Sequence, residues 1–103
     1  MKPVIIVSTF PNKTIIKKIG HQLVEKRLAA CVNISKIDSI YSWKGKIQND
    51  SEYLAIFKTT KKNQASLKKE IKKLHPYDVP EIAEINVNSL NKPYLDWLVD
   101  STN

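Results

Sequence analysis

The chain begins with a run of four consecutive apolar residues, Val-Ile-Ile-Val at 4–7. Consecutive β-branched residues are typical of a strand that is buried on both faces, so we expect this segment to lie centrally in a sheet. Pro11 and Asn12 come after the run. The proline breaks the strand, and an asparagine side chain can cap the first turn of a following helix.

A helical pattern then extends from about residue 13 to residue 28. Its apolar side chains, Ile15, Ile16, Ile19 and Leu23, fall within an arc of about 100°, and the charged residues lie mostly outside that arc. Gly20 lies inside this predicted helix, where glycine costs about 1 kcal/mol relative to alanine. Close packing of the helix against a sheet would account for it.

Two long strands and a tight turn are predicted in the middle of the chain. Alternating apolar positions from 30 to 34 predict a strand that continues through Trp43, and the next strand is strongest over 53–57. Between them, residues 44–46 (Lys-Gly-Lys) form a hairpin turn in which Gly45 is free to take a positive φ. Such a hairpin is a protruding arm, and in a monomer it exposes apolar surface and strand edges.

Residues 61–74 are predicted to form a second helix with two distinct faces. The apolar side chains lie within about 60° of one another, and six lysines occupy the opposite side. His75 and Pro76 end this helix, because the residue before a proline avoids the helical conformation.

A fourth strand and a short helix are predicted at the end of the chain. Apolar and polar residues alternate over 81–88, and we expect Ala83, Ile85 and Val87 to point inward. Residues 93–98 are predicted to form a short helix, with Pro93 near its first turn.

The order of these elements is β-α-β-β-α-β with a short C-terminal helix, in a single domain over residues 1–103. Right-handed crossovers convert this order into an α+β, ferredoxin-like sandwich with both long helices on one face of the sheet. The other face then needs a cover. In a chain of this size a partner subunit is the simplest one.

Composition and charge narrow the possible classes of protein. The chain carries 17 Lys and Arg against 10 Asp and Glu, for a net charge of +7, and it contains one cysteine. A single cysteine excludes an intramolecular disulfide and a Cys-rich zinc module. No apolar run is long enough for a secretory or membrane-spanning segment, so we expect a soluble, cytoplasmic protein without a membrane partner.

The positive net charge suggests that the protein could bind nucleic acid, but we regard this as a weak hypothesis. Six lysines and one glutamate lie between Lys61 and Lys73, and a solvated helix face accounts for them. An RNA-recognition domain has the same element order but needs a glycine in its aromatic third-strand motif, and residues 53–60 contain none. Acylphosphatase-like chemistry needs an arginine in the first loop, whereas the only arginine is Arg27.

Candidate chemistry concentrates in the loop at 75–81, His-Pro-Tyr-Asp-Val-Pro-Glu. Two prolines stiffen a segment that carries an imidazole, a phenol and two carboxylates, which is consistent with a ligand or metal contact and also with a structural turn. Cys31 has no recognisable base partner that could activate it as a nucleophile, so we interpret it as a small buried residue on a strand. One cysteine and two histidines form no spaced metal motif, although a symmetric oligomer multiplies sparse ligands.

Six segments, in order along nearly the whole chain, form a specific combined pattern. They are residues 7–9 with Pro11, 23–34 (LVEKRLAACVNI), 41–47 (YSWKGKI), Glu52 with 58–60 (KTT), 75–82 (HPYDVPEI) and 94–98 (YLDWL). This pattern resembles the CutA family, the divalent-cation tolerance proteins. The resemblance implies a fold close to that of the PII signalling proteins and a tight homotrimer whose long arms pair between subunits.

The resemblance also implies a function and a set of site residues. Members of the family are linked to tolerance of copper and other divalent cations, and no enzymatic activity is established for them. The matching positions near clefts between subunits are, for a bound effector, Trp43, Lys58, Tyr77, Glu81 and Trp97, and, for a metal such as copper(II), His75 and Cys31.

The sequence departs from the copper-binding pattern at two positions. Some members carry Cys where Ser8 stands and a second His where Leu74 stands, so His75 alone remains of that set. The leading hypothesis is a non-enzymatic homotrimer with a cation-related or small-effector signalling role. The alternatives are a structural scaffold trimer that acts through protein contacts and a weak nucleic-acid binder.

Overall fold

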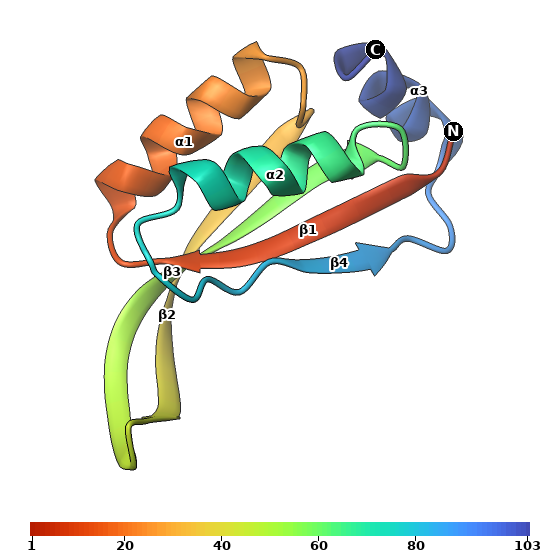
Figure 1. Cartoon of the computed structure of the whole chain (residues 1–103). Helices are drawn as coiled ribbons and strands as arrows, with labels where there is room; N and C mark the ends of the chain where they lie inside the picture. The colour runs from red at the N-terminus through yellow and green to blue at the C-terminus, as the bar shows by residue number, and fades with distance from the viewer.

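A four-stranded antiparallel sheet in the order β2-β3-β1-β4 forms the centre of the molecule. The computed structural model describes all residues, 1–103. In Figure 1, α1 and α2 lie side by side over one face of this sheet. The elements are β1 (Pro3–Phe10), α1 (Lys13–Glu25), β2 (Cys31–Trp43), β3 (Lys46–Thr60), α2 (Gln64–Leu74), β4 (Ala83–Asn86) and α3 (Lys92–Ser101). The ferredoxin-like α+β arrangement and the interior position of the first strand are therefore confirmed.

Strand β1 is fully buried on one face only. Val4, Ile6, Ser8 and Phe10 are buried beneath the helices, and the residues between them are half-buried. The run of four apolar residues predicted burial on both faces. In the single chain the second face lacks the cover of α1 and α2, which both lie on the other side (Figure 1).

Helix α1 begins as predicted and ends earlier. The Asn12 side chain accepts a hydrogen bond of 2.9 Å from the Ile15 amide, so the expected N-cap is confirmed. The helix stops at Glu25 instead of residue 28, in a Schellman motif in which Leu28 N–H donates to the carbonyl of Leu23. Arg27 stands with φ at 61° in the position usually taken by glycine, so the common sequence signal for this ending is missing.

Gly20 lies where α1 approaches β2. A Cβ atom built on this residue would stand 3.6 Å from the side chain of Val32, which is ordinary van der Waals contact. The helix therefore packs close to the sheet, as the sequence suggested, with room for one methyl group.

The β2-β3 hairpin extends past the rest of the sheet as the predicted arm (Figure 1). Its turn consists of Lys44 and Gly45, with φ values of 51° and 78°, and this pair of positive angles matches a two-residue type I′ turn. Ile40 and Ile47 near the tip are 74% and 69% exposed, so a single chain leaves the arm's apolar side chains in water.

Strand β4 differs from its prediction in length and in orientation. It spans four residues, and Ile85 is 51% exposed instead of pointing into the core. Its register opposite Ile5 places it on the sheet face without helices. Glu84, between Ala83 and Ile85, points to the side of the sheet that the helices cover, and it forms ion pairs with Lys68 at 2.8 Å and Lys61 at 3.3 Å. Polar and apolar residues therefore alternate as predicted, but the apolar ones point away from α1 and α2.

The sheet face opposite the helices, which we name the open face, is broad and apolar. The register places alternate residues of all four strands on it, and outside the arm most of them are half-buried. Its apolar members are Ile5, Val7, Ile37, Leu54, Ile56, Ala83 and Ile85. The expectation of an uncovered sheet face is met by the single chain.

The two remaining helices differ from prediction at their ends. Helix α2 begins at Gln64 after a turn at 61–63, and α3 runs three residues past the predicted end at 98, to Ser101. Pro93 lies in the first turn of α3, as expected. None of the helices is long and apolar enough to cross a membrane.

Candidate functional site

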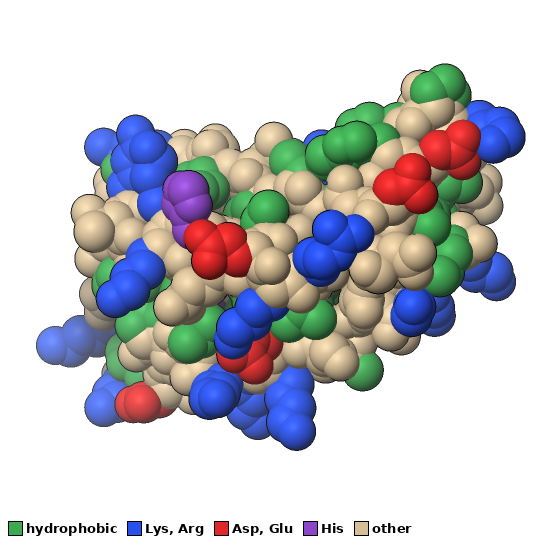
Figure 2. Space-filling model, turned by 90° about the horizontal axis from the view of Figure 1, so that it is seen from above, with side chains coloured by type: hydrophobic (Ala, Val, Ile, Leu, Met, Phe, Trp, Pro, Cys, Tyr) green, Lys and Arg blue, Asp and Glu red, His purple; other side chains and the backbone are tan.

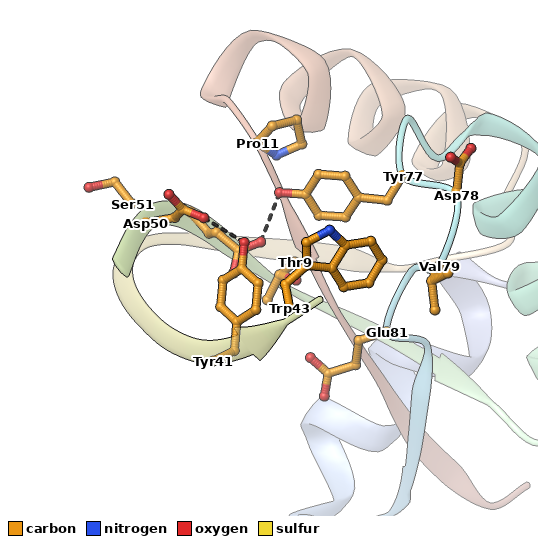
Figure 3. A pocket seen from close by; sticks show the side chains of 11 residues that line it. Thr9, Pro11, Tyr41, Trp43, Asp50, Ser51, Tyr77, Asp78, Val79 and Glu81 are labelled. Atoms are coloured by element: carbon orange, nitrogen blue, oxygen red, sulfur yellow. Dashed lines mark hydrogen bonds between the residues drawn. The ribbon is translucent and has the colours of Figure 1, made fainter. Parts of the chain in front are cut away.

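A cleft of about 570 Å³ lies between the arm and the loop that connects α2 to β4 (Figure 3). Side chains from the arm face side chains from residues 77–81 across it. Its walls combine three aromatic rings with four carboxylates: Tyr41, Trp43, Tyr77, Asp50, Glu52, Asp78 and Glu81. No lysine or arginine lines it.

The arm supplies its part of the cleft through strand alternation. Tyr41 and Trp43 are two residues apart on β2 and so point to the same side of the hairpin. Asp50 and Glu52 do the same on β3, and the register pairs them with Ser39 and Ile37. All four side chains therefore lie on the continuation of the open face along the arm.

Two phenol–carboxylate hydrogen bonds order the cleft. The Tyr77 hydroxyl donates to Glu52 at 2.8 Å, and the Tyr41 hydroxyl donates to Asp50 at 2.5 Å (Figure 3). Burial, together with the hydrogen bond to Glu52, raises the pKa of Tyr77 well above its usual value. The hydrogen bond to Asp50 likewise raises the pKa of Tyr41, so both tyrosines are neutral hydrogen-bond donors at pH 7.

His75 holds the loop to the end of β1. Its Nδ1 accepts a hydrogen bond of 3.1 Å from the Tyr77 amide, so the ring proton sits on Nε2, which lies 2.9 Å from the Thr9 carbonyl and 3.1 Å from Ser8 Oγ. The ring stacks on Phe10 with 4.2 Å between centroids. Burial lowers the pKa of His75, which favours this neutral form.

The donor groups of one chain do not build a metal site. No group of three or more His, Cys, Asp or Glu side chains is arranged to hold an ion. Both ring nitrogens of His75 already have hydrogen-bond partners, and a metal needs a free nitrogen lone pair. Cys31 pairs in register with Lys58, whereas His75 contacts the other end of β1, so the two predicted metal ligands lie apart.

The predicted effector residues fall into two groups. Trp43, Tyr77 and Glu81 line the cleft together. Lys58 lies on the open face towards α3, with its Nζ 5.6 Å from the Tyr94 ring centroid, and that ring is 5.3 Å from Trp97. A single chain therefore brings together three of the five and keeps Lys58 and Trp97 at the other end of β3.

Sequence reasoning singled out none of Tyr41, Asp50 and Glu52 as a site residue, and it included Asp78 only as one of the two carboxylates of the candidate loop at 75–81. The available signal was the two-residue turn at 44–45, because that turn sets the register of the arm. Alternation from this register puts the aromatic residues of β2 and the acidic residues of β3 on one side. The crossing of loop 75–81 beneath that side is a tertiary feature that no local pattern encodes.

The lysine-rich helix gives little support to nucleic-acid binding. Lys61 and Lys68 both bind Glu84, which removes two of the six lysines from any free basic stripe. In Figure 2, the Lys and Arg side chains on the face seen from above stand in several groups, with carboxylates between some of them. The arrangement matches a solvated helix face.

Comparison with known proteins gives one consistent result. The sequence model of the family described as CutA1 divalent ion tolerance protein matches residues 4–101. A relative from Thermotoga maritima, named divalent-cation tolerance protein CutA, is 45% identical over 98 residues, which are 95% of this chain and 97% of that protein.

Solved structures agree with the sequence match. A crystal structure of CutA1 from Pyrococcus horikoshii has a TM-score of 0.94 at 41% identity, covering 97% of this chain and 98% of that one. The structure of a periplasmic divalent cation tolerance protein CutA from Archaeoglobus fulgidus also has a TM-score of 0.94, at 36% identity, covering 98% and 99% of the two chains. Because the matches span nearly the whole chain in sequence and in structure, this protein belongs to the CutA family of divalent-cation tolerance proteins.

Proposed function

We propose that this protein contributes to the tolerance of divalent cations, copper(II) among them, as a non-enzymatic homotrimer that responds to a bound effector. The observation that carries the proposal is the family match over residues 4–101, which includes every element that forms the cleft. The cytoplasmic location expected from the sequence is part of the proposal. The Archaeoglobus relative is named periplasmic, so tagged protein should be localised by fractionation.

The open face supports assembly into a homotrimer. The open face, with its half-buried aliphatic side chains, and the exposed Ile40 and Ile47 on the other side of the arm together form more apolar surface than a small monomer usually leaves in water. A three-fold ring joins different surfaces of neighbouring copies. We propose that this ring brings Lys58 and Trp97 of one copy towards the cleft of the next, which completes the effector site around Trp43, Tyr77 and Glu81.

Tolerance is tested in a strain that lacks its own family member. Expression of this chain should restore growth at copper(II) concentrations that stop the empty-vector control. Glu81→Gln, which removes an exposed carboxylate from the cleft, should restore growth less well, and Glu25→Gln on α1 should match the parent. Equal growth of the parent and the empty vector would contradict the proposed role.

Direct metal binding is tested by copper(II) titration of the purified protein at about pH 7, where the imidazole is neutral. We expect His75→Ala and Cys31→Ser to bind copper(II) as the parent does, because both His75 nitrogens are already hydrogen-bonded and Cys31 lies apart. A loss of tight binding in either variant would instead identify that residue as a ligand, reached by a rearrangement or supplied jointly by several copies.

A scaffold role is the second candidate, and the open face is the observation that favours it. A scaffold trimer needs assembly and not the cleft. Under this alternative, Glu81→Gln would restore growth fully, and only variants that break the assembly would fail.

A further inference from the structure

Negative charge is concentrated in the cleft of a protein that is otherwise strongly basic. Four of the ten acidic residues line it, no lysine or arginine of the same chain does, and the net charge of the whole chain is +7. None of these four carboxylates takes part in an ion pair, whereas three of the six acidic residues elsewhere do, namely Glu70, Glu84 and Asp96. A cavity lined by one sign of charge raises the local concentration of the opposite ion.

The walls between these carboxylates are aromatic. The rings of Tyr41, Trp43 and Tyr77 line the same cleft, and the faces of such rings attract cations (Figure 3). One ammonium group already makes this contact, because Lys44 Nζ lies 5.9 Å from the centroid of the Trp43 ring. The Tyr77 and Tyr41 hydroxyls donate to Glu52 and Asp50, and these hydrogen bonds fix the positions of the two phenol rings.

The kind of cation follows from how these groups are spaced. A hard divalent ion takes six or more oxygen ligands at short distances. The cleft instead distributes its carboxylates around about 570 Å³, and no three of the chain's acidic, His or Cys side chains converge on one point. Spread negative charge combined with aromatic walls suits a large, weakly hydrated cation.

We propose that this cleft is a binding site for an organic ammonium ion, held by the rings of Trp43 and Tyr77 and by the charge of Asp50 and Glu81. This inference rests on the proposed function in one respect, since it names the chemical class of the effector at the same cleft. An organic cation, and not the metal itself, would then be the ligand to which the protein responds.

The test uses the full-length protein and tetramethylammonium as the probe, followed by backbone amide NMR. Saturable shifts are expected at residues 41–52 and 77–81. Neutral tert-butanol, which has a similar shape without the charge, should produce no saturable shift there, and neither should sodium chloride at equal ionic strength.

Two sets of variants separate the contribution of the aromatic ring from that of the carboxylate charge. Trp43→Leu should weaken binding by roughly two- to fivefold, with Trp43→Phe in between, since the phenyl ring keeps part of the cation contact. Glu81→Gln should weaken it, whereas Glu25→Gln, an exposed change of the same charge on α1, should not. Trp43, Glu81 and Glu25 are exposed, and the amide spectrum of each variant reports whether it is folded.

Three results would overturn the inference. They are equal binding of tert-butanol, no saturable shift at the cleft, and equal weakening by Glu81→Gln and Glu25→Gln. Binding that occurs only after Lys58→Gln would also overturn it, because Lys58 of a neighbouring copy would then be the cation that fills the cleft. If the probe fails while the chain still restores growth in copper(II), this inference falls and the proposed tolerance role stands.

Discussion

At the scale of single residues, His75 shows how chemistry and packing compete for one side chain. Its position before Pro76 and its two neighbouring carboxylates suggested a ligand. The structure gives both ring nitrogens partners and stacks the ring on Phe10. The side chain therefore acts as a neutral link between the loop at 75–81 and β1, and this link positions Tyr77 in the cleft.

This role predicts a pH dependence of stability. Burial lowers the pKa of His75 in the folded protein below the ordinary 6.5, so the unfolded chain takes up the proton first as the pH falls. The stabilisation is fully present above about pH 6.5 and is lost as the pH falls from there through the lowered pKa. The free energy of unfolding in urea, measured at fixed protein concentration between about pH 7.5 and 5, should fall more steeply for the parent than for His75→Gln.

The exposed histidine on α1 provides the control for this measurement. His21→Gln should keep the slope of the parent, since His21 is exposed. Equal slopes for the parent and His75→Gln would contradict the role of His75 as a neutral, half-buried link.

A second prediction at this scale concerns the two glycines. Gly20→Ala should raise the free energy of unfolding by about 0.5–1 kcal/mol, because alanine is the better helix former and its methyl group meets Val32 at an ordinary 3.6 Å. Gly45→Ala, at a φ of 78°, should lower it by about 1 kcal/mol. Urea denaturation of the two variants checks both signs, and a destabilised Gly20→Ala would show that the helix and sheet leave no such room.

At the scale of elements, local patterns predicted types and order well and missed endings that depend on tertiary contacts. The 3.6-residue spacing of Ile16, Ile19 and Leu23 identified α1, and all three are buried. The end of α1 was missed because Arg27, and not glycine, takes the left-handed position. Its guanidinium donates to the backbone carbonyls of Asp100 and Asn103, so a contact with the distant α3 holds that conformation.

The prediction that the apolar residues of β4 point into the core was wrong for a related reason. Alternation says which residues share a face but not which face the helices cover. Ile85 and Ala83 share a face with Ile5 and Val7, and α1 and α2 lie on the other one. The cleft was only partly predictable for the same reason, since its two walls meet through the path of loop 75–81 and not through any local pattern.

The Arg27 contact can be tested by a matched pair of variants. Arg27→Ala and Arg27→Gly both remove the bonds to the end of α3, but only the glycine relieves the left-handed backbone at φ 61°. The glycine variant should therefore be the more stable of the two by about 1–2 kcal/mol. Both should fall below the parent if the bonds to α3 contribute about 1 kcal/mol each; an alanine variant as stable as the parent would contradict this.

At the scale of the whole molecule, the open face connects fold and function. It carries the apolar surface that a chain of 103 residues leaves uncovered. The cleft lies towards one end of this face, and Lys58 with the Tyr94 and Trp97 rings lies towards the other. If copies cover one another there, the cleft becomes a site between subunits. The sequence suggested such a cover from the element order alone, and the register of the four strands shows which side chains make the surface.

The most direct test of this account is sedimentation equilibrium of the parent protein and of Ile56→Lys. Ile56 is half-buried at the centre of the open face, between Val7 on β1 and Asn33 on β2. Lys69→Glu, on the exposed side of α2, serves as the control. We predict three times the chain mass of 11.8 kDa for the parent and the control, and a single chain for Ile56→Lys. A parent protein that sediments as a monomer would contradict the account.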